Sequence, residues 1–265
     1  MRNPRSLAEE MERDPVLPKG SKERFSGYGV LGLPFRSGHI LAFRRMVSSS
    51  VGPGYASVWH RDPTGYWTFF TDVNPVLSCP RFFGALLDKV VVGEIEVRWE
   101  GPFSLSLRVP SSGFQWGIRL SSDFRTRVMS TVGRMAPSWM WRNGRIGSAL
   151  GTAGGRFLNL GHLSLAGAVP NAQTFYSAPN QLWRVEASAA ILNYDDLGPI
   201  GPLAQQAKLG DFWIPNSGLL AFGEARFSPL DPEEHSSLVT RDQNGSPLPG
   251  TDGIRGLPGR LRPAG

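Results

Sequence analysis

The sequence predicts a mainly β protein, built either as an antiparallel barrel or as paired β-sheets, with a basic helical insert. Three consecutive segments in the middle of the chain alternate apolar and polar residues: 94–99, 103–109 and 114–120. A side-chain period of two is typical of antiparallel strands with one buried face. Turns that contain glycine and proline separate the segments. We therefore expect a meander whose buried face includes Trp99, Leu105, Leu107 and Trp116.

Further strand signals precede and follow this meander. Before it, apolar and β-branched runs predict strands at 28–35, 39–47, 56–61 and 66–73. Asp62-Pro63-Thr64-Gly65 has the composition of a hairpin turn between the last two of these. After position 160, the predicted strands are 162–168, 173–176, 182–192, 212–214 and 219–227. The pattern leaves open whether the later strands form a second barrel.

The chain divides into five predicted segments. They are a polar N-terminal arm (1–27), a first sheet or barrel (28–121), a basic helical insert (122–158), a second set of strands (159–228) and a disordered tail (229–265). Ser121-Ser122-Asp123 is an N-cap signal for the insert. The tail is rich in proline and glycine and poor in large apolar residues, which is typical of disorder.

The positive charge of the chain is concentrated in the insert. The formal net charge is +6, and residues 124–156 contain six arginines and no acidic residue. This stretch fits peripheral contact with an anionic membrane, a lid over a barrel, or ordinary helices packed on the sheet. We expect no nucleic-acid partner, because no recognisable reader motif accompanies the charge.

Composition limits the chemistry further. Cys79 is the one cysteine among 265 residues, which excludes an internal disulfide or a cysteine-based zinc site and fits a cytoplasmic protein. Cys79 itself is expected to be a buried structural thiol, with a nucleophile as the alternative. Gly27–Gly32 matches G-x-G-x-x-G, but Pro34 follows where a dinucleotide site needs a helix. We predict no metal, no cofactor and no membrane-spanning segment.

Three ionisable residues are candidates for acid–base catalysis. His60 lies in a predicted strand, where an inward imidazole near Trp67, Phe69 or Asp72 could transfer protons. Asp72 and Asp211 have aromatic neighbours in the sequence, and burial raises the pKa of a carboxyl group in such surroundings. The structural alternatives are a histidine that caps a turn, and aspartates that cap loops or pair with an arginine such as Arg81.

Aromatic residues at inward strand positions predict a hydrophobic ligand site. A barrel of this size can enclose one small ligand, and few polar groups accompany the aromatic ones. The candidate ligand-binding residues are Trp67, Phe69, Trp99, Trp116, Trp183 and Trp213.

Three stretches resemble known proteins: 57–70, 95–105 and 114–120. On these stretches the chain is similar to an uncharacterised group of actinobacterial proteins, and the resemblance covers roughly residues 28–227. Mainly over 56–120, the chain also resembles the lipocalin-like superfamily that includes carotenoid 1,2-hydratase, AttH and some Diels–Alderases. That resemblance implies a lipocalin-like barrel and a hydrophobic substrate. Members of the superfamily typically pair two barrels in a longer chain, and no catalytic residue of theirs matches a position here.

Three functional hypotheses follow. The first is a cofactor-independent enzyme, of the lyase or isomerase type, that hydrates, isomerises or cyclises an isoprenoid, polyketide or lipid-like substrate by proton transfer. The second is a non-catalytic carrier of a lipophilic ligand that docks at membranes. The third is a structural domain whose aromatic residues are all core. The enzyme requires a buried ionisable group beside a ligand, whereas the carrier requires only an apolar site.

Overall fold

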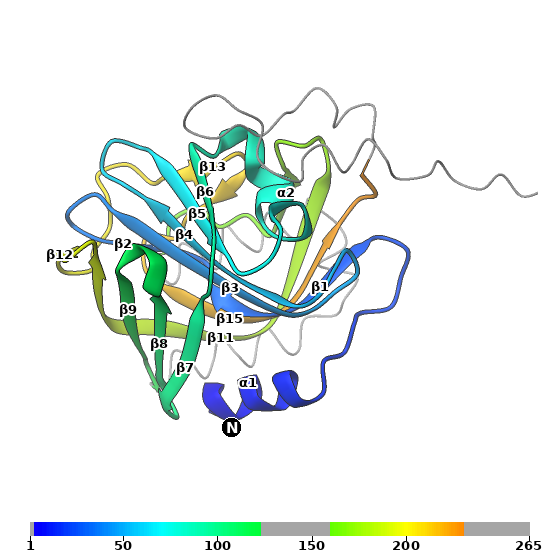
Figure 1. The fold of residues 1–265 in the computed structure, drawn as a ribbon, viewed down its shortest axis with the longest axis horizontal. Coiled ribbons are helices and arrows are strands. Elements are labelled where there is room, and N and C mark those ends of the chain that lie inside the picture. The colour runs from blue at the N-terminus through cyan, green and yellow to red at the C-terminus, as the bar shows by residue number, and fades with distance from the viewer. Residues whose placement is uncertain (1–2, 123–159, 231–265) are drawn as a thin grey trace, which may run out of the picture.

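The computed structural model describes residues 3–122 and 160–230 and shows a mainly β protein built on one curled sheet (Figure 1). The predicted fold class is therefore confirmed. The helical insert falls largely, and the tail almost wholly, outside the described residues. None of the helices within 3–122 and 160–230 has the length and apolar character needed to cross a membrane.

The first half of the chain supplies the strands at the two edges of the sheet. One group is β1 (Glu23–Val30), β2 (Leu33–Pro34), β3 (Ile40–Ser49), β4 (Tyr55–Arg61), β5 (Trp67–Thr71) and β6 (Lys89–Val92). The other group is the predicted meander: β7 (Glu96–Gly101), β8 (Ser104–Val109) and β9 (Phe114–Leu120). The strand order is β6-β5-β4-β3-β1-β15-β11-β9-β8-β7, antiparallel except for the parallel β5–β6 pair.

Two late strands, β11 (Thr174–Leu192) and β15 (Leu219–Phe227), lie in the middle of this sheet. The short strands β10 (Ala166–Ala168) and β12 (Asp195–Asp196) pair with β11, whereas β13 (Lys208–Leu209) and β14 (Phe212–Trp213) form a separate two-stranded sheet. Strand β15 pairs with β1 along its whole length, and the long β11 pairs with both β15 and β9. Apart from the β13–β14 pair, the two predicted sets of strands thus belong to the same sheet.

Short helices complete the described chain. They are α1 (Pro4–Arg13), η1 (Pro75–Leu77), α2 (Pro80–Phe83), η2 (Gly84–Leu86) and η3 (Pro110–Ser112). Asn3 caps α1, since its side chain accepts a hydrogen bond from the Ser6 N–H at 2.8 Å. The N-terminal arm is packed on the sheet: Ala8 is buried, and Glu12 forms an ion pair with Arg45 at 2.7 Å. The first strand also begins five residues earlier than predicted, at Glu23, because pairing with β15 continues to that point.

The sheet curls until its two edges approach each other. Strands β6 and β7 stand at opposite ends of the strand order, yet only residues 93–95 join them. Phe70 of β5 stacks on Phe114 of β9 with ring centroids 6.1 Å apart. The apolar cluster enclosed in this way is called the inner core and draws on both edges of the sheet; it includes Tyr28, Phe43, Val58, Phe70, Phe114, Trp116, Trp183 and Phe222.

The meander has the predicted register. Trp99 lies opposite Leu105, and Leu107 lies opposite Trp116. Leu105, Leu107 and Trp116 are buried in the inner core, while Trp99 packs against it and is only partly buried.

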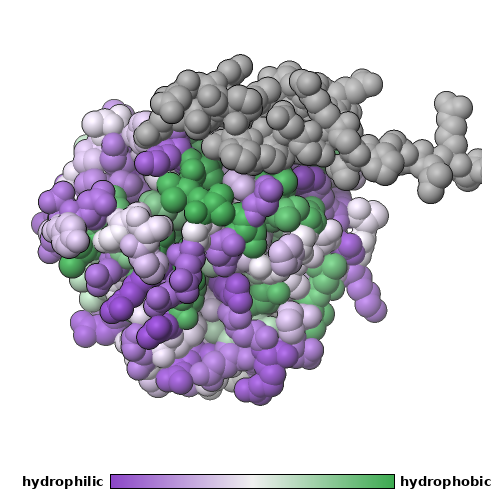
Figure 2. All heavy atoms as spheres, viewed as in Figure 1, coloured by the Kyte–Doolittle hydropathy of each residue, from purple (hydrophilic) through white to green (hydrophobic). Residues whose placement is uncertain are grey.

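A second apolar cluster covers the other face of β1, β3, β4 and β5, beneath η1, α2, η2 and β14. We call it the outer core; it includes Phe25, Ala42, Tyr55, Trp59, Trp67, Phe69, Cys79, Phe82, Phe83, Phe175 and Phe212. Because two cores sandwich these strands, β4 is buried at six consecutive positions from Tyr55 to His60. Buried and exposed positions therefore do not alternate along β4. Figure 2 shows that the viewed surface is mostly hydrophilic, apart from hydrophobic patches.

Glycines of β1 allow the close crossing of β1 and β3. A Cβ atom at Gly29 would overlap the carbonyl oxygen of Phe43, and one at Gly27 would overlap that of Arg45. The glycines of the G-x-G-x-x-G match thus serve sheet packing.

We expect Gly29→Ala to lower the free energy of unfolding by about 3 kcal/mol, because the backbone of a buried strand must move. Gly117→Ala is the matched control, since a Cβ there would lie 3.8 Å from the Ala189 oxygen, an ordinary contact. It should be neutral or slightly stabilising. Urea denaturation of both variants measures the difference, and equal stabilities would contradict this explanation.

Candidate functional site

His60 forms a pair with His39 on the inner-core side of β4. Its Nε2 lies 2.9 Å from His39 Nδ1, and the two rings stack with centroids 5.2 Å apart. Burial, and then the neighbouring His39, lower the pKa of His60 to about 4, against a weaker opposing effect of Asp62. Burial also lowers the pKa of His39. At pH 7 the pair is a neutral hydrogen bond between two imidazoles.

The predicted neighbours of His60 are wrong. His60 lies opposite Thr68, and Trp67 and Phe69 belong to the outer core on the other face of the sheet. Neighbouring residues of a strand point to opposite faces. Because His60 lies opposite Thr68, the residues on either side of Thr68, Trp67 and Phe69, point away from His60. A catalytic role for His60 stays a prediction.

Asp72 and Asp211 are exposed and accept hydrogen bonds from backbone groups. Asp72 Oδ1 accepts from the Ala56 N–H at 2.8 Å, and Asp211 Oδ2 accepts from the Ala168 N–H at 3.0 Å. Although the residue is exposed overall, partial burial of its carboxyl group raises the pKa of Asp72, opposed by the Ala56 N–H and by Arg45. Asp72 lies beside Ala56, four residues along β4 from His60, or roughly 13 Å. His60 and Asp72 therefore do not form one site, and Asp211 lies beside Ala168 of β10.

The six predicted ligand-binding residues are also divided. Trp67 and Phe69 lie in the outer core, while Trp116 and Trp183 lie in the inner core and Trp99 packs against it. Trp213 is partly buried on β14, with its ring 5.0 Å from that of His162 and 5.6 Å from Lys208 Nζ. A single ligand cannot touch residues on both faces of the sheet. Ligand contact by either group stays a prediction.

The outer core contains a charged residue that the sequence analysis did not select. Arg44 lies on β3 and is 7% exposed. Its guanidinium carbon lies 4.6 Å from the centre of the Trp59 ring and 5.3 Å from that of Phe212. Its Nη1 donates to the carbonyl oxygens of Val30 at 2.5 Å and Phe43 at 2.8 Å, and its Nη2 donates to Leu31 O at 3.3 Å.

Polar hydrogens of β4 lie beside this guanidinium. Ser57 is the direct strand partner of Arg44, and Tyr55 and Trp59 occupy the same face at period two. Ser57 Oγ and Trp59 Nε1 are buried and make no hydrogen bond of normal geometry within residues 3–122 and 160–230, although both interact with the Cys79 thiol, a weak acceptor. A buried donor without an acceptor costs about 1–3 kcal/mol, so such groups usually mark a missing acceptor.

Cys79 completes the cluster. Its sulfur lies 3.5 Å from Tyr55 Oη. Burial raises the pKa of the thiol, while Tyr55, Arg44, Trp59 and Ser57 act in the opposite direction. Burial also raises the pKa of the Tyr55 hydroxyl. At neutral pH both are therefore protonated. We call Arg44, Tyr55, Ser57, Trp59 and Cys79 the donor cluster, since it offers several polar hydrogens to one region of an aromatic core.

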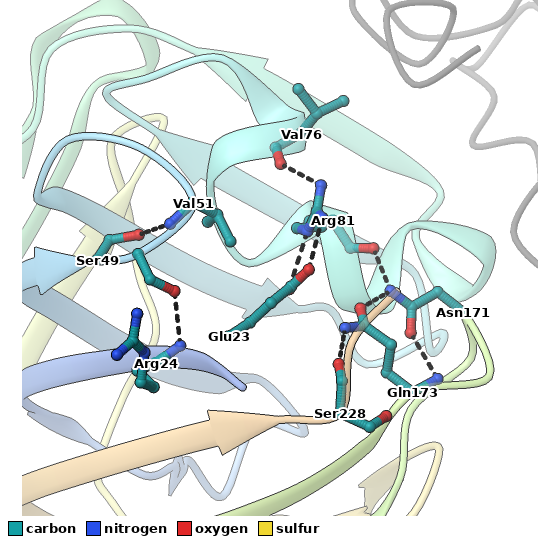
Figure 3. A network of polar contacts seen from close by, with 10 residues as sticks. Glu23, Arg24, Ser49, Val51, Val76, Arg81, Asn171, Gln173 and Ser228 are labelled. Carbon is teal, nitrogen blue, oxygen red and sulfur yellow. Dashed lines mark hydrogen bonds and ion pairs between the residues drawn. The ribbon is translucent and has the colours of Figure 1, made fainter. Parts of the chain in front are cut away.

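A polar network holds α2 and Cys79 over the sheet (Figure 3). Arg81 of α2 donates to both carboxylate oxygens of Glu23 at the start of β1, at 2.7 and 3.1 Å. The Arg81 carbonyl accepts from Asn171 Nδ2 at 2.9 Å, and Asn171 also donates to Gln173, which in turn donates to Ser228 O. Arg81 therefore pairs with Glu23 and not with an aspartate.

Beside Cys79, the Ser78 hydroxyl forms a 2.9 Å hydrogen bond with Thr71 at the end of β5. Segments that are distant in the sequence thus fix the position of the thiol from two sides.

Comparisons with known proteins give little guidance. No family model matches the chain, and no curated protein matches it. It is similar to acetoacetate decarboxylase from Legionella pneumophila subsp. pneumophila str. Philadelphia 1, with 11% identity, coverage of 84% of this chain and 93% of that chain, and a TM-score of 0.39. A further acetoacetate decarboxylase structure gives 10% identity, 82% and 91% coverage, and a TM-score of 0.38. With TM-scores below 0.5, neither similarity assigns a function to this chain.

Proposed function

We propose that this protein binds a small hydrophobic molecule, of isoprenoid, polyketide or lipid-like character, in the outer core at the donor cluster. The observation that carries this proposal is that Ser57 Oγ and Trp59 Nε1 are buried among aromatic rings and, in the described part of the chain, find no acceptor of normal geometry beyond the weak Cys79 thiol. Ligand sites are mostly apolar and contain a few placed polar groups that orient the ligand. A carbonyl or similar acceptor on the ligand would satisfy both donors, and the aromatic rings would contact its apolar part.

The test uses the methyl ester of 11-dansylaminoundecanoic acid, a neutral fluorescent probe with an ester carbonyl. The full-length protein should bind it and raise its fluorescence. Ser57→Ala and Trp59→Phe should each weaken binding about five- to tenfold, the usual effect of one lost hydrogen bond. Trp183→Phe is the matched control, because the same change in the inner core leaves the donor cluster intact. Absence of probe binding by the wild type, or equal losses in all three variants, would disprove the proposal.

A catalytic form of the same proposal is favoured by the convergence of donors. Hydrogen-bond donors directed at one oxygen stabilise the enolate-like charge that develops when a carbonyl compound is isomerised or hydrated. Since Tyr55 and Cys79 are protonated at neutral pH, they would donate hydrogen bonds to that oxygen. The base would come from elsewhere.

Three variants test the three predicted candidates for this base: His60→Gln, Asp72→Asn and Asp211→Asn. The assay is turnover of a ligand that copurifies with the protein. If all three variants keep full turnover, these residues are not the base; if the wild type shows no turnover, binding alone stands.

A further inference from the structure

We propose that the head group taken by the donor cluster is a carboxylate, with Arg44 as its counter-ion. This inference rests on the proposed function and narrows it, from any hydrophobic molecule with an acceptor to a hydrophobic carboxylic acid. It concerns Arg44, whereas the binding proposal rests on the neutral donors Ser57 and Trp59.

The positive charge of Arg44 has no anionic partner in the part of the chain that the structure describes. The ion pairs there involve other arginines, at positions 5, 45, 81, 98, 119 and 226. The only hydrogen-bond acceptors recorded for Arg44 in the same ranges are three backbone carbonyls. Burial lowers the pKa of Arg44 to about 10, so the guanidinium is still protonated at pH 7. A buried charge is costly unless an opposite charge compensates it.

The surroundings of Arg44 favour a carboxylate over other anions. Three of the five N–H donors of Arg44 are given to backbone carbonyls, which leaves Nε and one Nη2 hydrogen. These two donors form one side of the planar fork, which matches the two oxygens of a carboxylate. The neighbouring donors, Ser57 and Trp59, are neutral, so the site supplies one positive charge and suits a monoanion. A phosphate monoester at pH 7 carries a charge of about −1.5 to −2, which one arginine in an aromatic core would leave partly uncompensated.

The rings beside Arg44 are packed against one another. Trp59 stacks on Phe69 with centroids 4.4 Å apart and meets Phe83 and Phe212 edge-on. These rings surround the side of the guanidinium that contacts Trp59 and Phe212. An acid with an aliphatic or aromatic body would place its carboxylate at Arg44, and its body would have to separate these rings in order to lie among them.

The test compares 11-dansylaminoundecanoic acid with its methyl ester, which share the dansyl group and the aliphatic chain but carry an anionic and a neutral head group. The wild type should bind the acid at least tenfold more tightly than the ester at pH 7. Arg44→Met should abolish this preference, so that acid and ester bind with equal affinity. Arg45→Met is the matched control: the neighbouring arginine is already paired with Glu12, so the preference should persist.

The outcomes separate the two proposals. If the wild type binds acid and ester equally, the carboxylate inference is wrong and the binding proposal stands. If neither probe binds, the binding proposal itself fails. The comparison of probes on the wild type needs no variant, so it decides the matter even if Arg44→Met does not fold. If Arg44 only ties β3 to the Val30 and Leu31 carbonyls, and a water molecule occupies Ser57 and Trp59, the wild type will show no preference for the acid.

Discussion

Replacement of Arg81 by methionine should lower the free energy of unfolding by about 3 kcal/mol. Arg81 and Glu23 form a two-point ion pair whose side chains are only 10% and 13% exposed. Removing one partner leaves the other charge buried and unpaired, which costs about 3–5 kcal/mol in buried pairs. The slight exposure of both side chains favours the lower end of that range.

Urea denaturation provides the measurement, and Arg98→Met provides the control. Arg98 pairs with Glu96 at 3.1 Å, but its side chain is 67% exposed, so its loss should change stability by less than about 0.5 kcal/mol. Similar losses in both variants would mean that the Arg81–Glu23 pair contributes no more than a surface pair.

The Arg81→Met variant should also expose the thiol of Cys79. Arg81 follows Cys79 by two residues and anchors α2 to β1 and to Asn171. A loosened α2 opens more often, so 5,5′-dithiobis(2-nitrobenzoic acid) should react with Cys79 several-fold faster in Arg81→Met than in wild type. Since the chain has one cysteine, the reaction reports on this site alone. An unchanged rate would show that α2 is held independently of Arg81.

The sequence was most informative where one face of a strand meets solvent. In β9 the burial alternates strictly from Phe114 to Leu120, so period two identified both the strands of the meander and their register. In β4 both faces are buried, and the same rule could not say which residues share a surface. His60 was therefore grouped with residues of the opposite face.

The donor cluster was missed for a related reason. Arg44 and Arg45 are consecutive in a strand, so they must point to opposite faces. If both faces of that strand are covered, at least one of the two arginines must lie against a core. The consecutive arginines were therefore the signal in the sequence that could have indicated a buried charge. Local sequence could not show that both faces are covered, because the outer core is completed by Phe175 and Phe212, far along the chain. The same long-range pairing placed β11 and β15 at the centre of the sheet.

Acidification from pH 7 to pH 4 should destabilise the wild type by about 3 kcal/mol more than a His60→Gln variant. The pKa of His60 is about 4 in the folded protein, against 6.5 for an unperturbed histidine. Below pH 6.5 the unfolded chain takes up a proton that the folded chain accepts only near pH 4, so the stability that the neutral imidazole contributes is lost as the pH falls between these values. The gap corresponds to about 3 kcal/mol.

Glutamine keeps an amide that can hydrogen-bond to His39 and does not titrate, so the variant isolates the proton uptake of His60. Urea denaturation of both proteins at several pH values gives the difference, and the titration of the His60 ring protons by NMR gives the pKa directly. Parallel stability curves, together with a pKa near 6.5, would show that the imidazole is hydrated in the folded protein. A pKa near 4 with diverging curves would establish the His39–His60 pair as a buried neutral contact, which supports the sheet without supplying a base at neutral pH.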